Sequence, residues 1–573
     1  MVVVLLSYVY IFLMCLIAGV TIRKALSRFI PVPNEEKIGI TGIVTTGFVT
    51  LTVYAECFSI FYKVGAVCHV VMLVALAIGA YKCRDKISAL LINVRKRFRS
   101  KEGIVCLIIV LISAFYASRG VFHRDTGIYH AQAIRIIEEY GVIKGIGNFQ
   151  LHFAYNSSYL ALCALFTLSF ILPFALHTMT GFIMALFTCY AACGLMKWTS
   201  RAGHTADMAR LAIIIYGITV LEYLQSPATD YGAMYMVLYI MCAWITQAAE
   251  KKDDADDIPV YGYLAVLSIF TVSMKLSAAA LVVLAVLPFI LLVKKKMIKE
   301  TVLFIVIGFL SFLPYLVRNV IISGWLLYPA EAIDLFNVVW KVPAEYMKYD
   351  ADQIKVWGRE LQESFTVEDG IKVGISEWLP IWWEKKRFFE KLLLVFQVAG
   401  AGAAILNLII RKVRKKIRAD VAMFYIAVFI NIALWFFTAP FIRYGLAFLM
   451  LLPLCAAMDL AENIFKGKAF LRFAMVAIAV VCFGNWTLQY LKVDKERFVD
   501  HVKDPYYVTP IPFADSETDE VDMNGVIVYN TVHEDEEINS YYNCPCSCYN
   551  DMINRSELIG TTLKEGFKPK QEG

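Results

Sequence analysis

Long apolar blocks separated by short polar segments dominate the chain. The first block runs from Val2 to Ile22, and most later blocks approach the length of about 17–25 residues that an α-helix needs to cross a bilayer. Clear blocks lie near residues 39–61, 65–81, 103–117, 302–317, 391–410, 421–438, 444–458 and 472–489. The pattern predicts an all-α polytopic integral membrane protein with about 14 transmembrane helices.

Two regions depart from a plain succession of spans. Residues 158–198 hold two short apolar blocks divided at Pro173, and two full spans there would break the alternation of sides. We therefore expect 158–172 to form a re-entrant or outer-leaflet helix, which is tolerated where protein covers it. Residues 259–293 are expected to form a tight hairpin that turns near Lys275.

The basic residues orient this succession. Lys and Arg collect in short clusters between apolar blocks, at 82–101, 197–210, 294–299 and 411–418. Such clusters mark the cytoplasmic side of a membrane protein. The first block lacks a positive leading segment and is followed by Arg23 and Lys24, which predicts a first span with its N-terminus outside rather than a cleaved signal peptide.

This topology divides the chain into three parts. Residues 1–101 hold the N-terminal transmembrane helices, and residues 102–489 form a core with outer loops at 118–157 and 318–390. Residues 490–573 mix acids with Asn, Gly and Pro around a strand-like stretch from Gly525 to Tyr529. They predict a small α/β or β appendage on the outer face.

Composition supports the membrane class. Of the 573 residues, 59% are hydrophobic and 18% are charged, against about 45–50% and about 25% in soluble domains. This excludes a disordered chain and an ordinary soluble enzyme. The net charge of +6 comes from the clusters between spans, so we expect the lipid bilayer and not nucleic acid as a partner.

Several polar residues beside the spans fall on the predicted outer side. A charge in hydrocarbon costs at least about 2.5–3.5 kcal/mol, so it is retained where it is paired or used. Their convergence on one side predicts a single polar cavity. These residues are Asp125, His130, Asn156, Asp230, Lys275, Arg318, Asn319 and Arg443.

Asp125 is the candidate that could take the largest number of chemical roles. It stands before Thr126 and Gly127 at the entry to a short amphipathic helix, where an Asp is a common N-cap. It is equally suited to accept a proton as a general base, or to hold a divalent cation such as Mg²⁺ or Mn²⁺. The neighbouring histidines match no compact zinc motif, and His130 is expected to hydrogen-bond close to Asp125.

The other charges also leave alternatives open. Asp230 lies in a Pro-containing turn at residues 226–232, and it could serve either as a helix cap or as a second acid of the site. Lys275 and Arg443 suit phosphate contacts, and both also suit long side chains that reach toward the headgroups.

The first outer loop resembles a known family. His123-Arg-Asp-Thr-Gly-Ile-Tyr-His130 and Ile136-Ile-Glu-Glu-Tyr-Gly-Val142, followed by Asn156, resemble a bacterial membrane-protein family that is often found in polysaccharide gene clusters. That family is similar to the GT-C superfamily of glycosyltransferases. Further matching positions are Thr229 to Gly232, Lys275 to Ser277, Arg318-Asn319, Tyr328-Pro329 and Arg443. Gln150 and His152 depart from the family pattern, which carries His and Arg there.

The resemblance implies a GT-C-like fold and an outer-face glycosyltransferase. The implied donor is a polyprenyl-phosphate-linked sugar and the implied acceptor is a cell-surface glycan or a lipid-linked glycan. The implied location is the bacterial cell membrane, with the site facing the periplasm or the exterior. The catalytic candidates are Asp125, Asp230 and His130, and the substrate-binding candidates are Tyr129, Asn156, Lys275, Arg318, Asn319 and Arg443. A polysaccharide repeat-unit polymerase and a lipid-linked glycan transporter or flippase remain alternatives.

Overall fold

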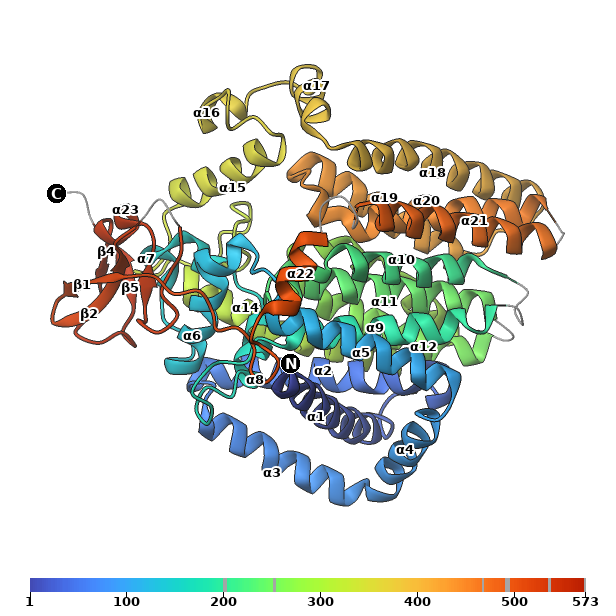
Figure 1. Ribbon diagram of the computed structural model, residues 1–573, viewed down its shortest axis with the longest axis horizontal. Coiled ribbons are helices and arrows are strands. Elements are labelled where there is room, and N and C mark those ends of the chain that lie inside the picture. Colours follow the sequence, from blue (N-terminus) through green and yellow to red (C-terminus); the bar gives the residue numbers. More distant parts are fainter. Residues whose placement is uncertain (199–202, 251–253, 466–467, 490–494, 534–536, 571–573) are drawn as a thin grey trace.

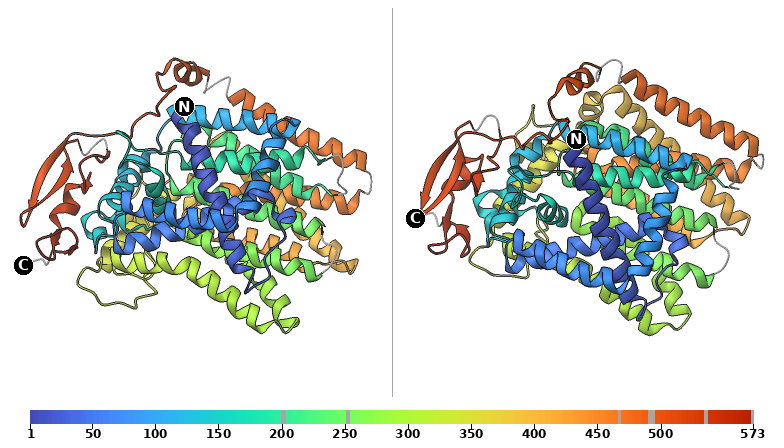
Figure 2. Two further views of the ribbon diagram at one scale, coloured as in Figure 1. Left: turned by 90° about the horizontal axis from the view of Figure 1, so that it is seen from below. Right: turned by 60° about the horizontal axis from the view of Figure 1, so that its bottom comes forward.

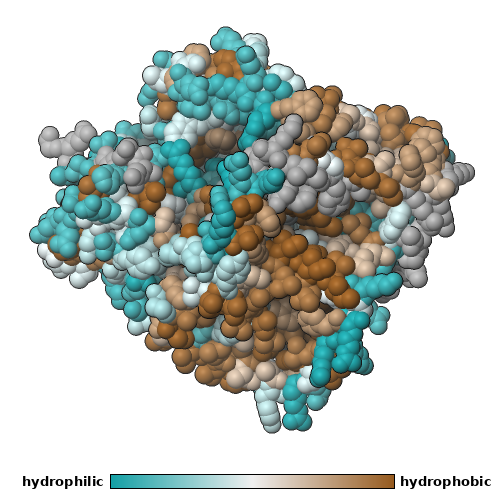
Figure 3. Space-filling model, viewed as in Figure 1, coloured by the Kyte–Doolittle hydropathy of each residue, from teal (hydrophilic) through white to brown (hydrophobic). Residues whose placement is uncertain are grey.

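The computed structural model describes residues 1–198, 203–250, 254–465, 468–489, 495–533 and 537–570. Long helices run side by side through the molecule, and a small sheet projects from one end (Figures 1 and 2). We call this end the sheet end and the other the far end. A hydrophobic surface covers the visible flank of the helices, whereas the sheet end is hydrophilic (Figure 3).

Within the described residues, ten helical segments are long and apolar enough to cross a membrane. They are α1 (Val2–Leu26), α2 (Glu35–Phe61), α5 (Lys101–Arg119), α11 (Thr229–Glu250), α12 (Asp254–Met274), η5 with α13 (Leu276–Ala285, Val286–Lys294), α14 (Ile298–Ser323), α18 (Phe388–Val413), α19 (Ala419–Thr438) and α20 (Ile442–Ile464). This agrees with a polytopic membrane protein, while the expected total of about 14 spans is not confirmed.

The difference in span count lies in the shorter helices. Helix α3 (Ala66–Lys82) meets α4 (Arg84–Arg97) at 90°, and the pair would make an eleventh span if it were counted as one. Helices α9 (Met179–Leu195) and α10 (Thr205–Thr219) have 17 and 15 residues. Helix α21, with bounds Lys468–Gln489, is not among the ten candidates. At about 1.5 Å per residue, α9 and α10 are shorter than the hydrocarbon core is thick.

Close helix packing follows from small residues. On α1 and α2, Gly19 and Gly47 face the partner helix so closely that a Cβ at either position would overlap backbone atoms of Ile43 or Cys15. Such small residues let helix backbones approach in a membrane, where the hydrophobic effect does not drive helices together.

Both unusual regions contain the elements that the sequence predicts, while the place of 158–172 in the membrane stays a prediction. Helix α8 (Ser158–Phe166) has nine residues, all buried, so it is too short to span and is covered by protein. An irregular segment then leads to α9. Lys275 lies between α12 and η5, at the turn of the expected hairpin.

The sheet end contains two additions to the bundle. Helices α15 (Ala344–Gly358), α16 (Val367–Gly370) and α17 (Ile375–Lys385) form an arm between α14 and α18 (Figure 1). The C-terminal part contains α22 (Lys495–Lys503), β1 (Thr518–Met523), β2 (Val526–Thr531), β3 (Cys546–Ser547), α23 (Asn550–Asn554), β4 (Ser556–Leu558) and β5 (Phe567–Pro569). Strands β1 and β2 pair antiparallel, β3 joins β2 in parallel, and β4 pairs with β5. The small sheet expected in an α/β or β appendage is confirmed, while its position on the outer face stays a prediction.

Candidate functional site

Asp125 lies at the sheet end, directly before the π-helical turn η1 (Thr126–His130), which continues into α6 (Ala131–Glu139). Its carboxylate accepts no capping hydrogen bond from the turn, so the interpretation of Asp125 as an N-cap is wrong. Oδ2 of Asp125 instead accepts a hydrogen bond from Nη2 of Arg443, at 3.1 Å. π-Helical turns within helices are frequent at functional sites.

Arg443 stands in the first turn of α20 and connects two acids. Its Nε lies 3.8 Å from Oδ2 of Asp230, which is in the first turn of α11. Asp230 in turn forms an ion pair with Lys275 from the hairpin between α12 and η5. Four charges from distant parts of the sequence therefore meet at one place, and we call Asp125, Asp230, Lys275 and Arg443 the four-charge cluster.

Aromatic and imidazole groups surround this cluster. The hydroxyl of Tyr444 accepts a hydrogen bond from Arg443 at 3.2 Å, and Nζ of Lys275 lies 4.1 Å from the centre of the Tyr444 ring. Nε2 of His123 lies 2.5 Å from Nη1 of Arg443. The side chain of Arg443 is 34% exposed and that of Asp125 is 21% exposed, so a ligand can approach both.

The charges set the protonation states of the loop residues. Burial by itself would raise the pKa of Asp125. The nearby charges of Arg443 and His123 lower this pKa by more than burial raises it, so it lies below its ordinary value. Burial lowers the pKa of His123, and it lowers the pKa of His130 to about 3. At neutral pH the site thus holds an ionised Asp125 beside neutral histidines.

His130 and Tyr129 lie in the turn that follows Asp125. His130 is buried, and neither of its ring nitrogens has a hydrogen-bond partner among the described residues. The hydrogen bond expected for it near Asp125 is thus not found. Burial and the nearby Asp125 raise the pKa of Tyr129, whose ring stacks on His152 at 5.5 Å between centres.

Three other candidates lie outside the four-charge cluster. Nε of Arg318 donates to Oδ1 of Asn156 at 3.2 Å, and its Nη1 contacts Ser59. Arg318 and Asn156 line a small cavity of about 40 Å³ that is otherwise largely apolar. Asn319 donates to the carbonyl of Leu326 at 3.0 Å and so holds the turn after α14. Among the described residues, no hydrogen bond or ion pair joins these three side chains to the four-charge cluster, so the expectation of one polar cavity for all the candidates is not confirmed.

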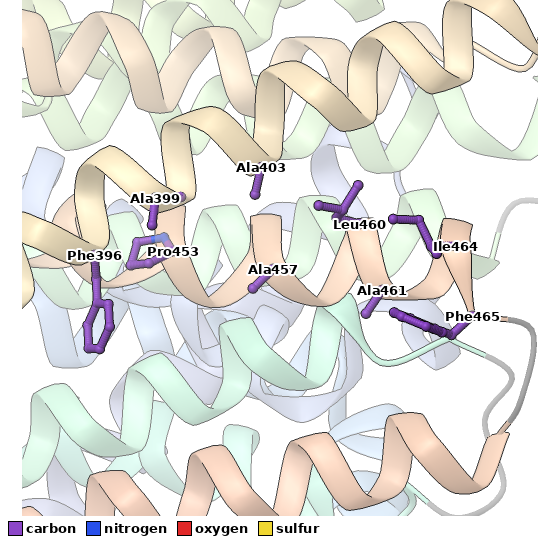
Figure 4. Close-up of a pocket in the computed structure, with 10 residues that line it drawn as sticks. Phe396, Ala399, Ala403, Pro453, Ala457, Leu460, Ala461, Ile464 and Phe465 are labelled. Atoms are coloured by element: carbon purple, nitrogen blue, oxygen red, sulfur yellow. The ribbon is translucent and has the colours of Figure 1, made fainter.

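A larger cavity of about 380 Å³ lies between α18 and α20 (Figure 4). Its lining comprises Phe396, Ala399, Gly400, Ala403, Pro453, Ala457, Leu460, Ala461, Ile464 and Phe465. No side chain of this lining is polar, so the cavity suits only an apolar chain and offers no group for chemistry.

The C-terminal segment supports the turn that carries Asp125, which sequence reasoning did not anticipate. The side-chain amide of Asn539 donates to the carbonyl of Ile128 at 2.6 Å and to Oε1 of Gln150 at 3.1 Å. Its backbone N–H donates to the carbonyl of Gly127 at 2.9 Å. No local pattern around residue 539 signals this role, since the contact joins segments about 400 residues apart.

The divalent cation considered for Asp125 stays a prediction. Over the part of the chain that the structure describes, no group of three or more His, Cys, Asp and Glu side chains is arranged to hold a metal. Both carboxylates of the four-charge cluster are already paired with basic groups.

The fold and the site define a polytopic helical membrane protein with a cluster of paired charges at one end of its bundle. Residues 1–450 match a family described as a domain of unknown function (DUF8201), and the chain belongs to this family. Neither the comparison with curated proteins nor the comparison with solved structures gave a match.

Proposed function

We propose that this protein is a membrane glycosyltransferase that moves a sugar from a polyprenyl-phosphate donor to a cell-surface or lipid-linked glycan acceptor. The proposed site is the four-charge cluster, facing the periplasm or the exterior of a bacterial cell. The observation that carries the proposal is the pairing of an ionised, partly exposed Asp125 with Arg443. The resemblance of the loop around Asp125 to the GT-C superfamily supports the choice of chemistry.

The cluster supplies the two functions that such a transfer needs. A hydroxyl oxygen of the acceptor attacks the anomeric carbon of the donor sugar, and its proton passes to the carboxylate of Asp125. The bond between the anomeric carbon and the phosphate oxygen breaks, with inversion at that carbon. The departing phosphate is neutralised by Arg443 together with Lys275, since both cations face the same place.

The remaining candidates receive supporting roles. Asp230 holds Lys275 and Arg443 together and acts as a second acid that orients the acceptor. His130 and Tyr129 belong to the turn that follows Asp125 and pack beside it. Arg318 and Asn156 contact each other away from the cluster, so we assign the phosphate contact to Lys275 rather than to Arg318.

Replacement of Asp125 tests the proposal. In the native cell, Asp125→Asn removes the base while keeping the shape of the side chain, and Asp519→Asn on exposed β1 removes an acid away from the cluster. After protein levels are matched, we expect Asp125→Asn to lose one sugar from the surface glycan by mass spectrometry, with accumulation of the lipid-linked donor. Asp519→Asn should leave the glycan unchanged.

Other outcomes separate the alternatives. An unchanged glycan in the Asp125→Asn cells would refute the role of Asp125. Loss of whole repeat units, with single-sugar addition intact, would favour a polymerase. Accumulation of a complete lipid-linked glycan on the cytoplasmic side would favour a transporter.

A further inference from the structure

Helix α4 differs from the helices of the bundle in direction and in charge. It leaves the end of α3 at 90°, and it lies across the far end of the molecule (Figure 1). Residues 82–101 contain eight basic residues against the single acid Asp85. We call α4 together with residues 98–101 the basic platform.

The neighbouring helix fixes the depth of the basic platform. One side of α3 is apolar and exposed, with Val70, Val74 and Ile78 each more than half exposed, as expected of a surface that faces lipid tails. The 17 residues of α3 rise about 25 Å, which covers most of the hydrocarbon core of about 30 Å. A helix that turns through 90° at the end of α3 therefore lies in the plane of the lipid headgroups.

The side chains of α4 separate into two faces. Ile87 is buried, and Leu90 and Leu91 pack against the core, at the spacing of one helical stripe. Arg95, Lys96 and Arg97 are exposed in the last turn. The apolar stripe thus anchors the helix to the bundle, and the charges remain available.

The basic side chains nearest the end of α4 have few acidic neighbours among the described residues, and the charge of Glu102 lies near Arg97. Lys86 is paired with Glu35, and Arg84 lies 3.6 Å from Asp85. Among the residues that the structure describes, none makes an ion pair with the exposed side chains of Arg95, Lys96, Arg97, Arg99 or Lys101. Five cations close together at the headgroup layer repel one another unless anions lie between them.

We propose that the basic platform binds the headgroups of anionic phospholipids. Exposed cations at the headgroup layer attract the phosphates of anionic lipids, whereas zwitterionic lipids, which carry no net charge, attract them less. Exposed Ile92 and Phe98 lie among the charges and suit the boundary between headgroups and tails. This proposal is independent of the glycosyltransferase activity.

Native mass spectrometry of the full-length protein in detergent tests the proposal. Phosphatidylglycerol and phosphatidylcholine are titrated separately, and the bound lipids are counted. We expect retention of phosphatidylglycerol in preference to phosphatidylcholine, and a loss of that preference when the ionic strength is raised from about 0.05 M to about 0.5 M.

Matched variants locate the binding. R95Q/K96Q/R97Q removes three charges from the basic platform and keeps the other basic residues that orient the chain. K348Q/K355Q/K372Q removes three charges from the arm at the sheet end, where Lys348 and Lys372 are exposed and Lys355 is half-buried. The platform variant should bind phosphatidylglycerol roughly tenfold more weakly, and the arm variant should bind it as the unmodified protein does.

Two results would overturn the proposal. One is equal retention of phosphatidylglycerol by the platform variant and the unmodified protein, as a platform that docks another protein would give. The other is a preference that does not respond to salt in the unmodified protein. If the triple variant fails to fold, R99Q/K101Q outside α4 replaces it, with a smaller loss expected.

Discussion

Two Arg–Asp pairs connect α20 to the rest of the molecule, one at each end of that helix. At the sheet end Arg443 pairs with Asp125, and their side chains are 34% and 21% exposed. Toward the far end Arg411 of α18 pairs with Asp459, and these side chains are 17% and 4% exposed. The same two residue types therefore occur in two settings. We call Arg443–Asp125 the open pair and Arg411–Asp459 the closed pair.

The closed pair is satisfied by its neighbours. Asp459 also accepts hydrogen bonds from Asn407 and from the hydroxyl of Tyr425, the latter at 3.0 Å. Asn463 contacts Asn407 and completes the group. A buried network with such partners fixes how helices pack, because breaking it leaves an uncompensated charge.

The open pair is connected differently. Arg443 is shared between Asp125 and Asp230, with the longer contact at 3.8 Å, and its side chain is partly exposed. A charge group with loose contacts can exchange a protein partner for a ligand. The comparison of the two pairs shows that the number of hydrogen-bond partners and the exposure, rather than the residue types, distinguish a structural ion pair from a candidate site.

The largest expected effect comes from removing the open arginine. Under the proposed function, we expect Arg443→Gln to lower sugar transfer by about 10²–10³-fold, since it removes the cation assigned to the leaving phosphate. Transfer by the purified protein, measured per folded molecule, checks this. Arg411→Gln is the matched control, and a similar loss per folded molecule in both variants would contradict the comparison.

The closed pair should instead respond in stability. Asp459→Asn leaves Arg411 without its counter-ion and should cost about 3 kcal/mol. A lower unfolding temperature in detergent, with unchanged transfer per folded molecule, would agree. An unchanged unfolding temperature would show that the closed pair does not hold α18 to α20.

The sheet end should also make stability depend on pH. His130 has a pKa of about 3 when folded, but about 6.5 when unfolded, so the unfolded chain binds the proton first. Stability is therefore lost as pH falls below about 6.5, by about 2 kcal/mol at pH 5. Unfolding temperatures between pH 7 and 5 measure this slope. His130→Asn should flatten the slope, whereas His533→Asn, which changes an exposed histidine, should not.

The smallest expected effect concerns the support of the Asp125 turn. Asn539→Ala removes two hydrogen bonds to the turn and to Gln150, which should loosen the turn by about 1–2 kcal/mol. Hydrogen exchange of residues 126–132 should accelerate while exchange in α20 stays the same. Acceleration in both segments would mean that Asn539 supports the whole molecule rather than the turn.

The sequence predicted the features that depend on local pattern. Apolar blocks gave the long helices, the short block at 158–172 gave a buried non-spanning helix, and Lys275 marked a hairpin. The strand near 525–529 appears as β2. The predictions for the apolar blocks succeed because unpaired backbone groups are costly in a bilayer, which limits the conformations that such a block can adopt.

Features that depend on packing between distant segments could not be predicted. The sequence placed Arg318 and Arg443 on one side of the membrane, but it could not show that Arg318 contacts Asn156 while Lys275 reaches Asp230. Nor could it separate a cap from a charge partner at Asp125, since both need an acid at that position. Asn539 was not foreseen because its partners lie far away in the chain.

The contact between Asp125 and Arg443 also bears on the order in which substrates act. While the two side chains are paired, the carboxylate is a weak base, because the guanidinium stabilises its charge. An arriving phosphate that draws Arg443 away raises the basicity of Asp125 at the moment when a donor is present. Under the proposed function, this interlock favours compulsory donor-first kinetics.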